Sequence, residues 1–428
     1  MNYEKYKIEN IYKIICRLIY IMTTKTISPN SKLSEYIKTY LASSDRGDEL
    51  EIRFGTKHWN PITKIDFNNV ISKLKSMGFE NKSGEDYHLN INNEYNDPRT
   101  GQRRISNIRT AISGLEKIQS YCKKNTLDPE TLGFGTWGIV FEKKTIKYHN
   151  GDKLGPIDFH KFQFRVNYKQ EKKLKPEFNL VQTMLSKWND SKKVFRFIKR
   201  FTFTHSDYPL KVDCSIVRTS KTRPTKFGAT MIPEFRIESS NLFQNQEHFE
   251  IEIEVVKNMT PHIYQITETY LSKIKHIIKL VMAGLQGSNF PISYEEQDAI
   301  TDNYMEIINP KNTPERRIRT SDFIGPQSVS LEMTNVSPID EDARIPNIRQ
   351  PYTVTDKADG VRKLMFIHKT GKIYFIDVNM KVQFTGVITK NKDIHNTIND
   401  GEHVLHDKIG KFINLYLAFD IYYLNNKD

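Results

Sequence analysis

Two stretches in which charged and apolar residues alternate strictly place the tightest constraint on the fold. Residues 48–55 read DELEIRFG and residues 249–256 read FEIEIEVV. Alternation with a period of two predicts β-strands that have one apolar face and one charged face. The charged positions are Glu49, Glu51, Arg53, Glu250, Glu252 and Glu254. Either strand taken alone is also compatible with a solvated sheet edge.

The acidic faces of these two strands are expected to meet, because the strands lie at opposite ends of one β-rich region. Carboxylates brought together repel each other strongly, and a divalent cation would relieve that repulsion. Ligation by oxygen atoms alone suits Mg²⁺ or Mn²⁺. The two strands therefore predict a carboxylate metal site.

The region between the acidic strands reads as a series of short β segments. They are residues 103–112, 137–148, 159–170, 194–205, 211–218 and 234–237. Several of them alternate Arg or Lys with apolar residues. A closed barrel would remove exposed sheet edges and give these strands an inside. An inside with carboxylates at one position and cations at others predicts a phosphate-plus-metal site. The alternative is that these cations face outward and serve solubility.

The acidic strands and the basic region between them resemble the triphosphate tunnel metalloenzymes, in particular the RNA 5′-triphosphatases of fungi, protozoa, poxviruses and giant DNA viruses. The resemblance implies an α+β chain that begins with an antiparallel eight-stranded tunnel. It implies Glu49, Glu51 and Glu254 as metal ligands. Glu250 and Glu252 would hold those ligands or orient the attacking water, with Arg53 beside them. The phosphate-binding residues that it implies are Arg109, Arg165, Lys169, Arg200, Lys211 and Arg218.

A second candidate site lies at Lys357-Ala-Asp-Gly-Val-Arg362, between two apolar runs within residues 352–367. We expect Lys357 on a tight turn at or near a strand end, with Gly360 supplying a backbone conformation that other residues resist. A lysine beside other cations or in a desolvated position suits a covalent nucleophile, and Arg362 suits a phosphate or ribose. The alternative is a solvated Asp-Gly hairpin turn.

The same residues resemble the K-x-D-G-x-R signature of the covalent nucleotidyltransferases, which include mRNA guanylyltransferases and the DNA and RNA ligases. Three further stretches follow the order of that family, namely FIGPQSVS at 323–330, DGEHV at 400–404 and YLAFDI at 416–421. The first resembles the lead-in of capping guanylyltransferases more than that of ligases. The resemblance implies a nucleophilic Lys357 and a nucleotide-binding set of Asp359, Gly360, Arg362, Glu402 and Phe419, with Phe419 stacking on guanine. Val378 departs from the family, which often has an Arg there.

These features predict four parts of the chain: an extension at 1–25, a triphosphatase tunnel at 26–286, a linker or early helix of the next domain at 287–318, and a guanylyltransferase portion at 319–428. A helical period runs from Pro261 to Leu285 and is expected to pack on the barrel. The apolar run Ile11–Met22 is too short to span a membrane. Because the later motifs of the transferase family are absent, we expect a complete triphosphatase and only the front part of a ligase-type nucleotidyltransferase fold.

Composition favours a polyanionic partner, since the formal net charge is +13. The three cysteines form no paired motif, which suits a reducing compartment such as a host cytoplasm, or a virion. Residues 133–138 match G-x-G-x-x-G, but the strand-like sequence that follows argues against a dinucleotide site.

The sequence thus predicts mRNA 5′ capping, in which the first domain removes the γ-phosphate of 5′-triphosphate RNA and the second transfers GMP from GTP through Lys357. The resemblance adds a cap methyltransferase domain or subunit as a partner and no membrane. Three alternatives stay open: an ATP-dependent ligase-like protein, a tunnel hydrolase of polyphosphate or small triphosphates, and a non-enzymatic basic RNA-binding scaffold.

Overall fold

The two acidic strands belong to one closed barrel and lie next to each other in it. The computed structural model describes residues 29–55, 61–128, 133, 138–225, 228–257, 267–309, 318–326, 330–339, 345–351, 357–425 and 427. The chain divides into two units, residues 1–287 and 288–428. The predicted extension 1–25, the helix start at Pro261, residues 327–329 of the guanylyltransferase-like lead-in and the run 352–356 before Lys357 lie outside the described residues.

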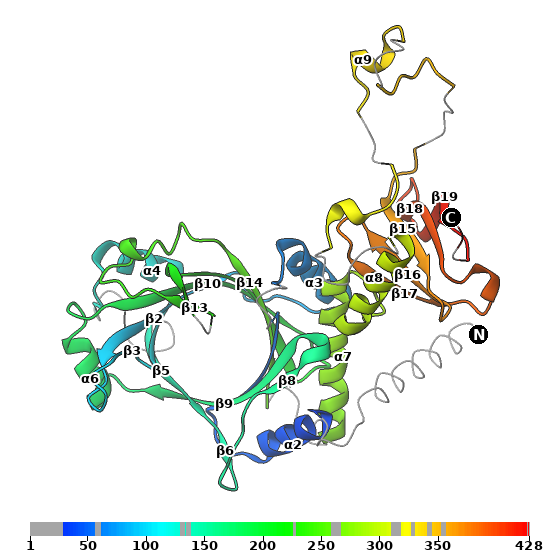
Figure 1. Ribbon diagram of the computed structural model, residues 1–428. Coiled ribbons are helices and arrows are strands. Elements are labelled where there is room, and N and C mark those ends of the chain that lie inside the picture. Colours follow the sequence, from blue (N-terminus) through cyan, green and yellow to red (C-terminus); the bar gives the residue numbers. More distant parts are fainter. Residues whose placement is uncertain are drawn as a thin grey trace. The chain divides into compact units, whose positions relative to one another are not determined.

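Eight strands of a ten-stranded antiparallel sheet close into the barrel of the first unit (Figure 1). In order around the barrel they are β1 (Asp48–Phe54), β14 (His248–Val255), β11 (Leu210–Thr219), β10 (Lys193–Thr204), β2 (Asp86–Asn96), β4 (Ile108–Ser113), β5 (Ile139–Ile146) and β9 (Phe164–Leu174). The pairing of β9 with β1 closes the ring. The predicted eight-stranded antiparallel tunnel is therefore confirmed.

Smaller elements attach to the barrel. Strand β3 (Arg103–Ile105) pairs with the end of β2, and β8 (Ile157–Phe159) pairs with β9. Two short ribbons are formed by β6 (Tyr148–His149) with β7 (Asp152–Lys153) and by β12 (Thr222–Thr225) with β13 (Gly228–Met231). The 3₁₀ helices are η1 (His160–Phe162) and η2 (Glu238–Ser240).

The segment 103–112 was expected as one strand and forms two. The segment 234–237 was expected as a strand and contributes one isolated bridge, Lys193 to Glu234.

The hydrophobic core of the first unit lies outside the barrel, between its wall and the surrounding helices. These helices are α2 (Pro29–Ala42), α3 (Lys64–Ser76), α4 (Leu115–Lys124), α6 (Asn179–Ser186) and α7 (Thr267–Gln286). On β1, Leu50 and Ile52 are fully buried on the outward face. Beneath α4 and α6, residues such as Ile91 and Tyr121 form a second cluster. Since one face of each strand meets these helices, the other face is free to carry charge.

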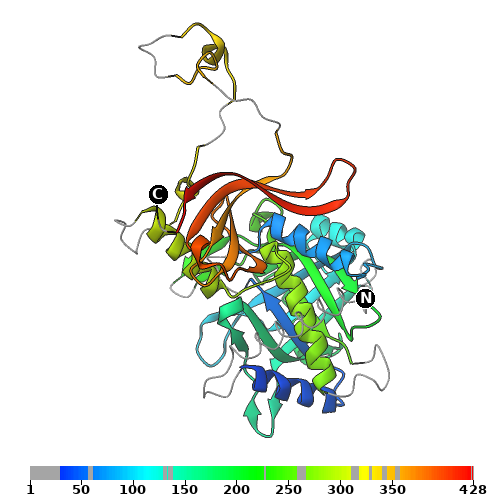
Figure 2. The same cartoon turned by 90° about the vertical axis from the view of Figure 1, so that its right-hand side faces the viewer.

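Helix α7 packs along the outside of the barrel against α2 and α3 (Figure 2). The contact with α3 is close because Gly284 has no side chain: a Cβ there would lie 2.6 Å from the Cα of Val70. None of the described helices is both long enough and apolar enough to cross a bilayer.

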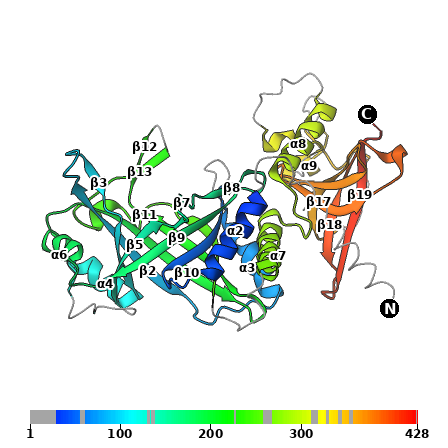
Figure 3. The same cartoon turned by 90° about the horizontal axis from the view of Figure 1, so that it is seen from below.

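The second unit is a five-stranded antiparallel sheet against which helix α8 packs. The sheet order is β17 (Val382–Ile388), β16 (Lys372–Asp377), β15 (Val361–Ile367), β18 (Thr397–His406) and β19 (Phe412–Tyr423). The helical elements are α8 (Tyr294–Ile308), α9 (Met333–Val336) and the 3₁₀ helices η4 (Thr320–Asp322) and η5 (Lys392–Ile394). Helix α8 contacts β17 (Figure 3), and its Ile300 and Tyr304 enter the core with Leu364 and Phe366. Much of 287–318 is therefore an early helix of the second unit and not a free linker.

Candidate active site in the lumen of the barrel

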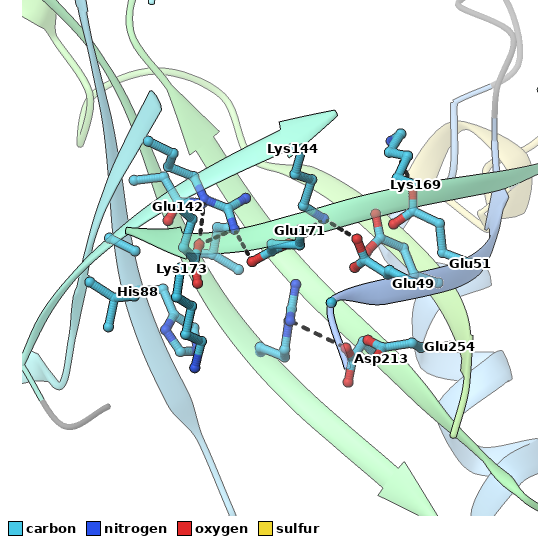
Figure 4. Close-up of a pocket in the computed structure, with 18 of the residues that line it drawn as sticks. Glu49, Glu51, His88, Glu142, Lys144, Lys169, Glu171, Lys173, Asp213 and Glu254 are labelled. Carbon is cyan, nitrogen blue, oxygen red and sulfur yellow. Dashed lines mark hydrogen bonds and ion pairs between the residues drawn. The ribbon is translucent and has the colours of Figure 1, made fainter. Parts of the chain in front are cut away.

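The lumen of the barrel is a polar cavity of about 890 Å³ to which all eight strands contribute (Figure 4). Each strand supplies alternate residues, because side chains in a strand point to opposite faces in turn. The charged residues that line the lumen are Arg46, Asp48, Glu49, Glu51, Arg53, Arg109, Glu142, Lys144, Lys169, Glu171, Lys173, Arg196, Arg200, Lys211, Asp213, Glu252 and Glu254. Acidic and basic groups thus alternate around one enclosed space.

Strands β1 and β14 bring the predicted carboxylates together as expected. Glu51 and Glu254 are directly paired in the ladder, and Arg53 is paired with Glu252. Each of the three predicted metal ligands bonds to a lysine: Glu49 to Lys144 at 2.6 Å, Glu51 to Lys169 at 2.9 Å and Glu254 to Lys211 at 2.9 Å. Each of these three carboxylates therefore has a lysine ammonium group as its counter-charge.

Within the described part of the chain, no group of three acidic, His or Cys side chains is arranged to hold a metal ion. The chemistry of the site nevertheless fits one. Carboxylates on hydrogen-bonded neighbouring strands offer an all-oxygen ligand set of the kind that Mg²⁺ and Mn²⁺ prefer. A cation among Glu49, Glu51 and Glu254 would replace the lysine ammonium groups as the counter-charge.

The carboxylates differ in how their surroundings affect the pKa. Burial alone would raise the pKa of Glu51, but the ammonium groups of Lys144 and Lys169 outweigh it, so the pKa lies below the ordinary value. Burial raises the pKa of Glu252, and Arg53 only partly opposes the change. Burial raises the pKa of Glu254 as well, against the effect of Lys211. Of these three carboxylates, Glu51 is thus the one whose surroundings favour the charged form.

A second group of charges faces these carboxylates from β4, β5 and β9. Arg109 Nε donates to Glu142 at 2.9 Å, and its Nη2 lies 3.2 Å from Glu171. Lys144 bridges Glu171 at 3.0 Å and Glu49. This chain of ion pairs runs from Glu49 of β1 around the adjacent wall formed by β9, β5 and β4, and part of it is visible in Figure 4.

Asp213 completes the lumen on β11. Its side chain accepts a hydrogen bond from Thr202 at 2.7 Å and lies 3.2 Å from Arg200. The residues that the sequence-based list missed include Lys144, Glu142, Glu171, Arg196 and Asp213. All of them lie on strands with visible alternation, so the signal was present, but a period of two does not say which face is inside.

Two residues predicted to bind phosphate lie elsewhere. Arg165 lies at the N-terminal end of β9, outside the lumen lining. Its Nε donates to Oδ1 of Asp158 in β8 at 2.7 Å. Arg218 bonds to Glu247 at 2.9 Å and to the carbonyl of Phe243. Its position on β11 has the opposite parity to Lys211 and Asp213, so it faces away from the lumen. The other four predicted cations, Arg109, Lys169, Arg200 and Lys211, line the cavity.

Glu250 and Arg53, both expected to support the metal ligands, lie next to one another. Arg53 contacts Glu250 at 3.4 Å and Glu252 at 2.6 Å, and Glu250 also bonds to Arg196. Glu250 is not among the residues that line the lumen. Its contacts make it an anchor for two arginines.

In the second unit, Lys357 is exposed and lies just before β15. Asp359 is exposed as well. Gly360 does not take the left-handed conformation that the sequence suggested. A Cβ there would lie 2.6 Å from the carbonyl oxygen of His403, so glycine is required by close packing of two chain segments.

Arg362 is held by Asp400, the first residue of the predicted D-G-E motif. Arg362 Nε donates to Asp400 Oδ1 at 3.0 Å, Nη1 donates to the carbonyl of Pro326 at 2.6 Å, and Tyr422 donates to Asp400 at 2.6 Å. Asp400 is fully buried. Glu402 is the ladder partner of Arg362, and Phe419 on β19 is 62% exposed. Three of the four motifs therefore meet around one buried carboxylate, and Phe419 presents a free aromatic ring.

The chain is similar in sequence to known proteins. Residues 265–428 match the family described as mRNA capping enzyme, catalytic domain. Over 238 residues the chain is 24% identical to a probable mRNA-capping enzyme of Acanthamoeba polyphaga mimivirus. The chain is a homologue of that viral mRNA-capping enzyme. The alignment spans 55% of this chain and 16% of the mimiviral protein.

Solved structures with similarity to the chain include the RNA triphosphatase domain of a trifunctional mimivirus mRNA capping enzyme. That comparison gives 17% identity and a TM-score of 0.37, and it covers 58% of this chain and 95% of the other. The Pct1 RNA triphosphatase of S. pombe gives 12% identity and a TM-score of 0.28, with 66% and 93% covered.

Proposed function

We propose that the first unit removes the γ-phosphate from 5′-triphosphate RNA. The observation that supports this most directly is the closed lumen, in which acids from β1 and β14 face cations from β4, β5, β9, β10 and β11. A triphosphate carries several negative charges and requires cations on several sides at once. A flat basic surface would bind it without enclosing the reacting phosphorus.

The residues of the lumen have separable roles in this reaction. Arg109, Lys144, Lys169, Arg200 and Lys211 would bind phosphate oxygens and stabilise charge as it develops. Glu252 would orient the attacking water, with Arg53 fixing its position. Glu49, Glu51 and Glu254 would hold Mg²⁺ or Mn²⁺, which when bound polarises the γ-phosphate and neutralises its charge. Partial burial of these side chains strengthens the interactions relative to those on an open surface.

The test is release of γ-phosphate from triphosphate-ended RNA with Mg²⁺ or Mn²⁺. Wild-type protein should release phosphate only with metal, and Glu51→Ala should abolish release. Glu116→Ala, which removes an exposed glutamate of α4, is the control and should leave the rate unchanged. Absence of release from folded wild-type protein with metal would overturn the proposal, whereas release from tripolyphosphate but not RNA would favour a small-triphosphate hydrolase.

We propose a second activity for the second unit, in which the Lys357 amine attacks the α-phosphorus of GTP. The amine loses a proton, a P–N bond forms, and pyrophosphate leaves. The motif at 357–362 and the family match over 265–428 support this proposal. Asp359, Glu402 and Arg362 would contact the nucleotide, and Phe419 would stack on the guanine.

Covalent labelling with GTP tests the second activity. Label from α-labelled GTP should remain on the protein and disappear in Lys357→Ala, while Lys369→Ala, another exposed lysine of the same unit, should label normally. Label from ATP but not from GTP would instead indicate a ligase. The diphosphate end of the RNA would then attack the same phosphorus, so that the P–N bond breaks, the Lys357 amine is regenerated and the GMP is joined to the RNA. The capped end is the substrate of a cap methyltransferase, which we propose as the next activity. The free thiols of Cys122 and Cys214 fit the reducing host cytoplasm, or a virion, as the location that we propose for this protein.

A further inference from the structure

A groove of about 790 Å³ lies on the outer wall of the barrel, between the hairpin of β2 with β3 and helix α6. Both elements occupy the same side of the barrel in Figures 1 and 3. The groove takes no part in the proposed chemistry. Its lining combines exposed rings such as Tyr95 and Phe235, three cations (Arg103, Lys187 and Lys192), two carboxylates (Glu94 and Asp190), and amide, hydroxyl and apolar groups.

The rings and cations of the groove are placed as a single-stranded nucleic acid would require. Tyr95 is 45% exposed and Phe235 is 49% exposed, although large aromatic side chains normally bury more of their surface. Lys192 Nζ lies 5.4 Å from the centre of the Phe235 ring. Arg103 is mostly exposed, and its one ion pair, with Glu94, is long at 3.8 Å. Exposed rings with adjacent cations can stack bases and bind the phosphates between them.

The floor of the groove contains a buried acceptor that lacks a hydrogen bond. Asn93 is 4% exposed, and its Nδ2 donates to Ser191 Oγ at 2.7 Å. Its Oδ1 has no partner among the described residues. A buried unpaired acceptor is costly and calls for an explanation. Because this oxygen is itself buried, a ligand in the groove would reach it only after the Asn93 side chain moves.

The groove and the lumen share the same two strands. Asn92 and Arg109 face the lumen, whereas their neighbours Asn93 and Ile108 line the groove. Asn92 Nδ2 also donates to the carbonyls of Ser106 and Ile108, both of which line the groove, at 3.1 Å. A chain that leaves the lumen over this rim therefore enters the groove after crossing one thickness of the wall.

We propose that this groove binds the single-stranded RNA that follows the 5′-triphosphate, and so makes an RNA chain the preferred substrate over a free nucleotide. This inference rests on the proposed triphosphatase activity of the lumen. Tyr95 and Phe235 stack on bases, and Lys187, Lys192 and Arg103 bind the phosphates. The lumen recognises the reacting end, and the groove recognises the polymer attached to it.

The experiment compares phosphate release from three substrates: tripolyphosphate, GTP and a triphosphate-ended RNA of about 12 nucleotides, a length within the usual range of single-strand sites. In wild-type protein the KM should be lowest for the RNA. In Tyr95→Ala/Phe235→Ala the KM for RNA should rise by roughly tenfold for each lost stacking contact, with KM and kcat for tripolyphosphate unchanged. Tyr148→Ala, which removes a 60% exposed ring of β6, is the matched control and should behave as wild type.

Each outcome decides the proposal. Equal KM values for RNA and GTP, or an unchanged KM for RNA in the double variant, would overturn it while leaving the triphosphatase intact. A change for tripolyphosphate of the same size would show a structural effect and also overturn it. If wild-type protein hydrolyses none of the substrates, the proposed function fails, and the groove is judged by the binding of a fluorescent 5′-hydroxyl RNA. Loss of that binding in the double variant but not in Tyr148→Ala supports the groove, and equal binding overturns it.

Salt dependence provides an independent readout of the phosphate contacts. If Lys187 and Lys192 each neutralise one phosphate, Lys187→Ala/Lys192→Ala should make the slope of log K against log salt less steep by about 1.4. Lys390→Ala, an exposed lysine of the second unit, should leave the slope unchanged. An unchanged slope in the double variant contradicts the assignment of these lysines.

Discussion

At the scale of single residues, the site is organised by ion pairs that link acids and bases of different strands. Lys144 is the clearest example, since its ammonium group lies 2.6 Å from Glu49 and 3.0 Å from Glu171. The nearby carboxylates outweigh the effect of burial and raise the pKa of Lys144. It is therefore a permanently charged group at the centre of the lumen, and substrate can compete for it without changing its protonation.

The first prediction concerns Lys144. Lys144→Ala should lower kcat for phosphate release by about a hundredfold, the usual cost of removing one preorganised donor to a developing charge. Lys143→Ala is the matched control, because Lys143 is the next residue of β5 and is not part of the lumen lining. It should change kcat by less than about twofold. Equal losses in the two variants, measured by steady-state phosphate release, would contradict the placement of Lys144.

The second prediction concerns Asp400, which is fully buried and accepts hydrogen bonds from Arg362 and Tyr422. Asp400→Asn should lower the free energy of unfolding of the second unit by about 2 kcal/mol, because charge-assisted bonds to a buried acid are lost. The urea midpoint measures the change. Asp393→Asn, at an exposed position of η5, should leave the midpoint unchanged, and a similar shift in both variants would rule out a special role for Asp400.

At the scale of elements, the barrel depends on helices that cover its apolar outer face. Helix α7 is central to this, because residues such as Ile274 and Ile277 along its length are fully buried. Its approach to α3 is limited by a single glycine, and the backbone of Val70 occupies the space that a side chain would need. Two helices packed this closely have little room to adjust.

The third prediction follows from that contact. Alanine is about 1 kcal/mol better than glycine within a helix, but Gly284→Ala would place its Cβ 2.6 Å from the Val70 Cα. We expect a net loss of about 1 kcal/mol, since overpacking of a core typically costs about 1–3 kcal/mol and exceeds the helix gain. Thermal unfolding measures the loss. Gly155→Ala, where an added Cβ meets nothing within 4 Å, is the control and should not destabilise the protein.

At the scale of the whole molecule, the two units have separate cores and separate candidate sites. The core of the second unit contains residues from 292 to 398 and takes none from the barrel. The carboxylates proposed to hold metal all belong to the first unit. Ligands of one site should therefore stabilise one unit and leave the other unchanged.

The fourth prediction tests this with metal alone. Mn²⁺ at 100 times its dissociation constant should stabilise the first unit by about 2.7 kcal/mol, which corresponds to roughly 5–10 °C for a domain of this size. Scanning calorimetry should show one transition that moves and one that does not. Glu51→Ala/Glu254→Ala should abolish the shift. The transition that Gly284→Ala lowers identifies the first unit, and a Mn²⁺ shift of the other transition would contradict the proposed site.

Much of the fold could be read from local patterns in the sequence. Alternation within 48–55 and 249–256 predicted two strands and their acidic faces, and the mix of segments between them predicted a closed barrel. The prediction was wrong where a pattern was short or interrupted. Residues 234–237 form one bridge instead of a strand, and β2 was missed although Leu89 and Ile91 alternate with polar residues.

The sequence by itself determined the two acidic strands, their charged faces and the motif at Lys357, because each of these depends on neighbouring residues. Only the tertiary structure decided which charged residues share the lumen. Arg165 and Arg218 lie outside it, whereas Lys144 and Asp213 lie within it. Register between strands far apart in the chain sets this choice, and a period of two is identical for the inside and the outside of a barrel. The pairing of β9 with β1 fixes which residues of these strands lie side by side. It therefore fixes which charged side chains of the site are close enough to form ion pairs.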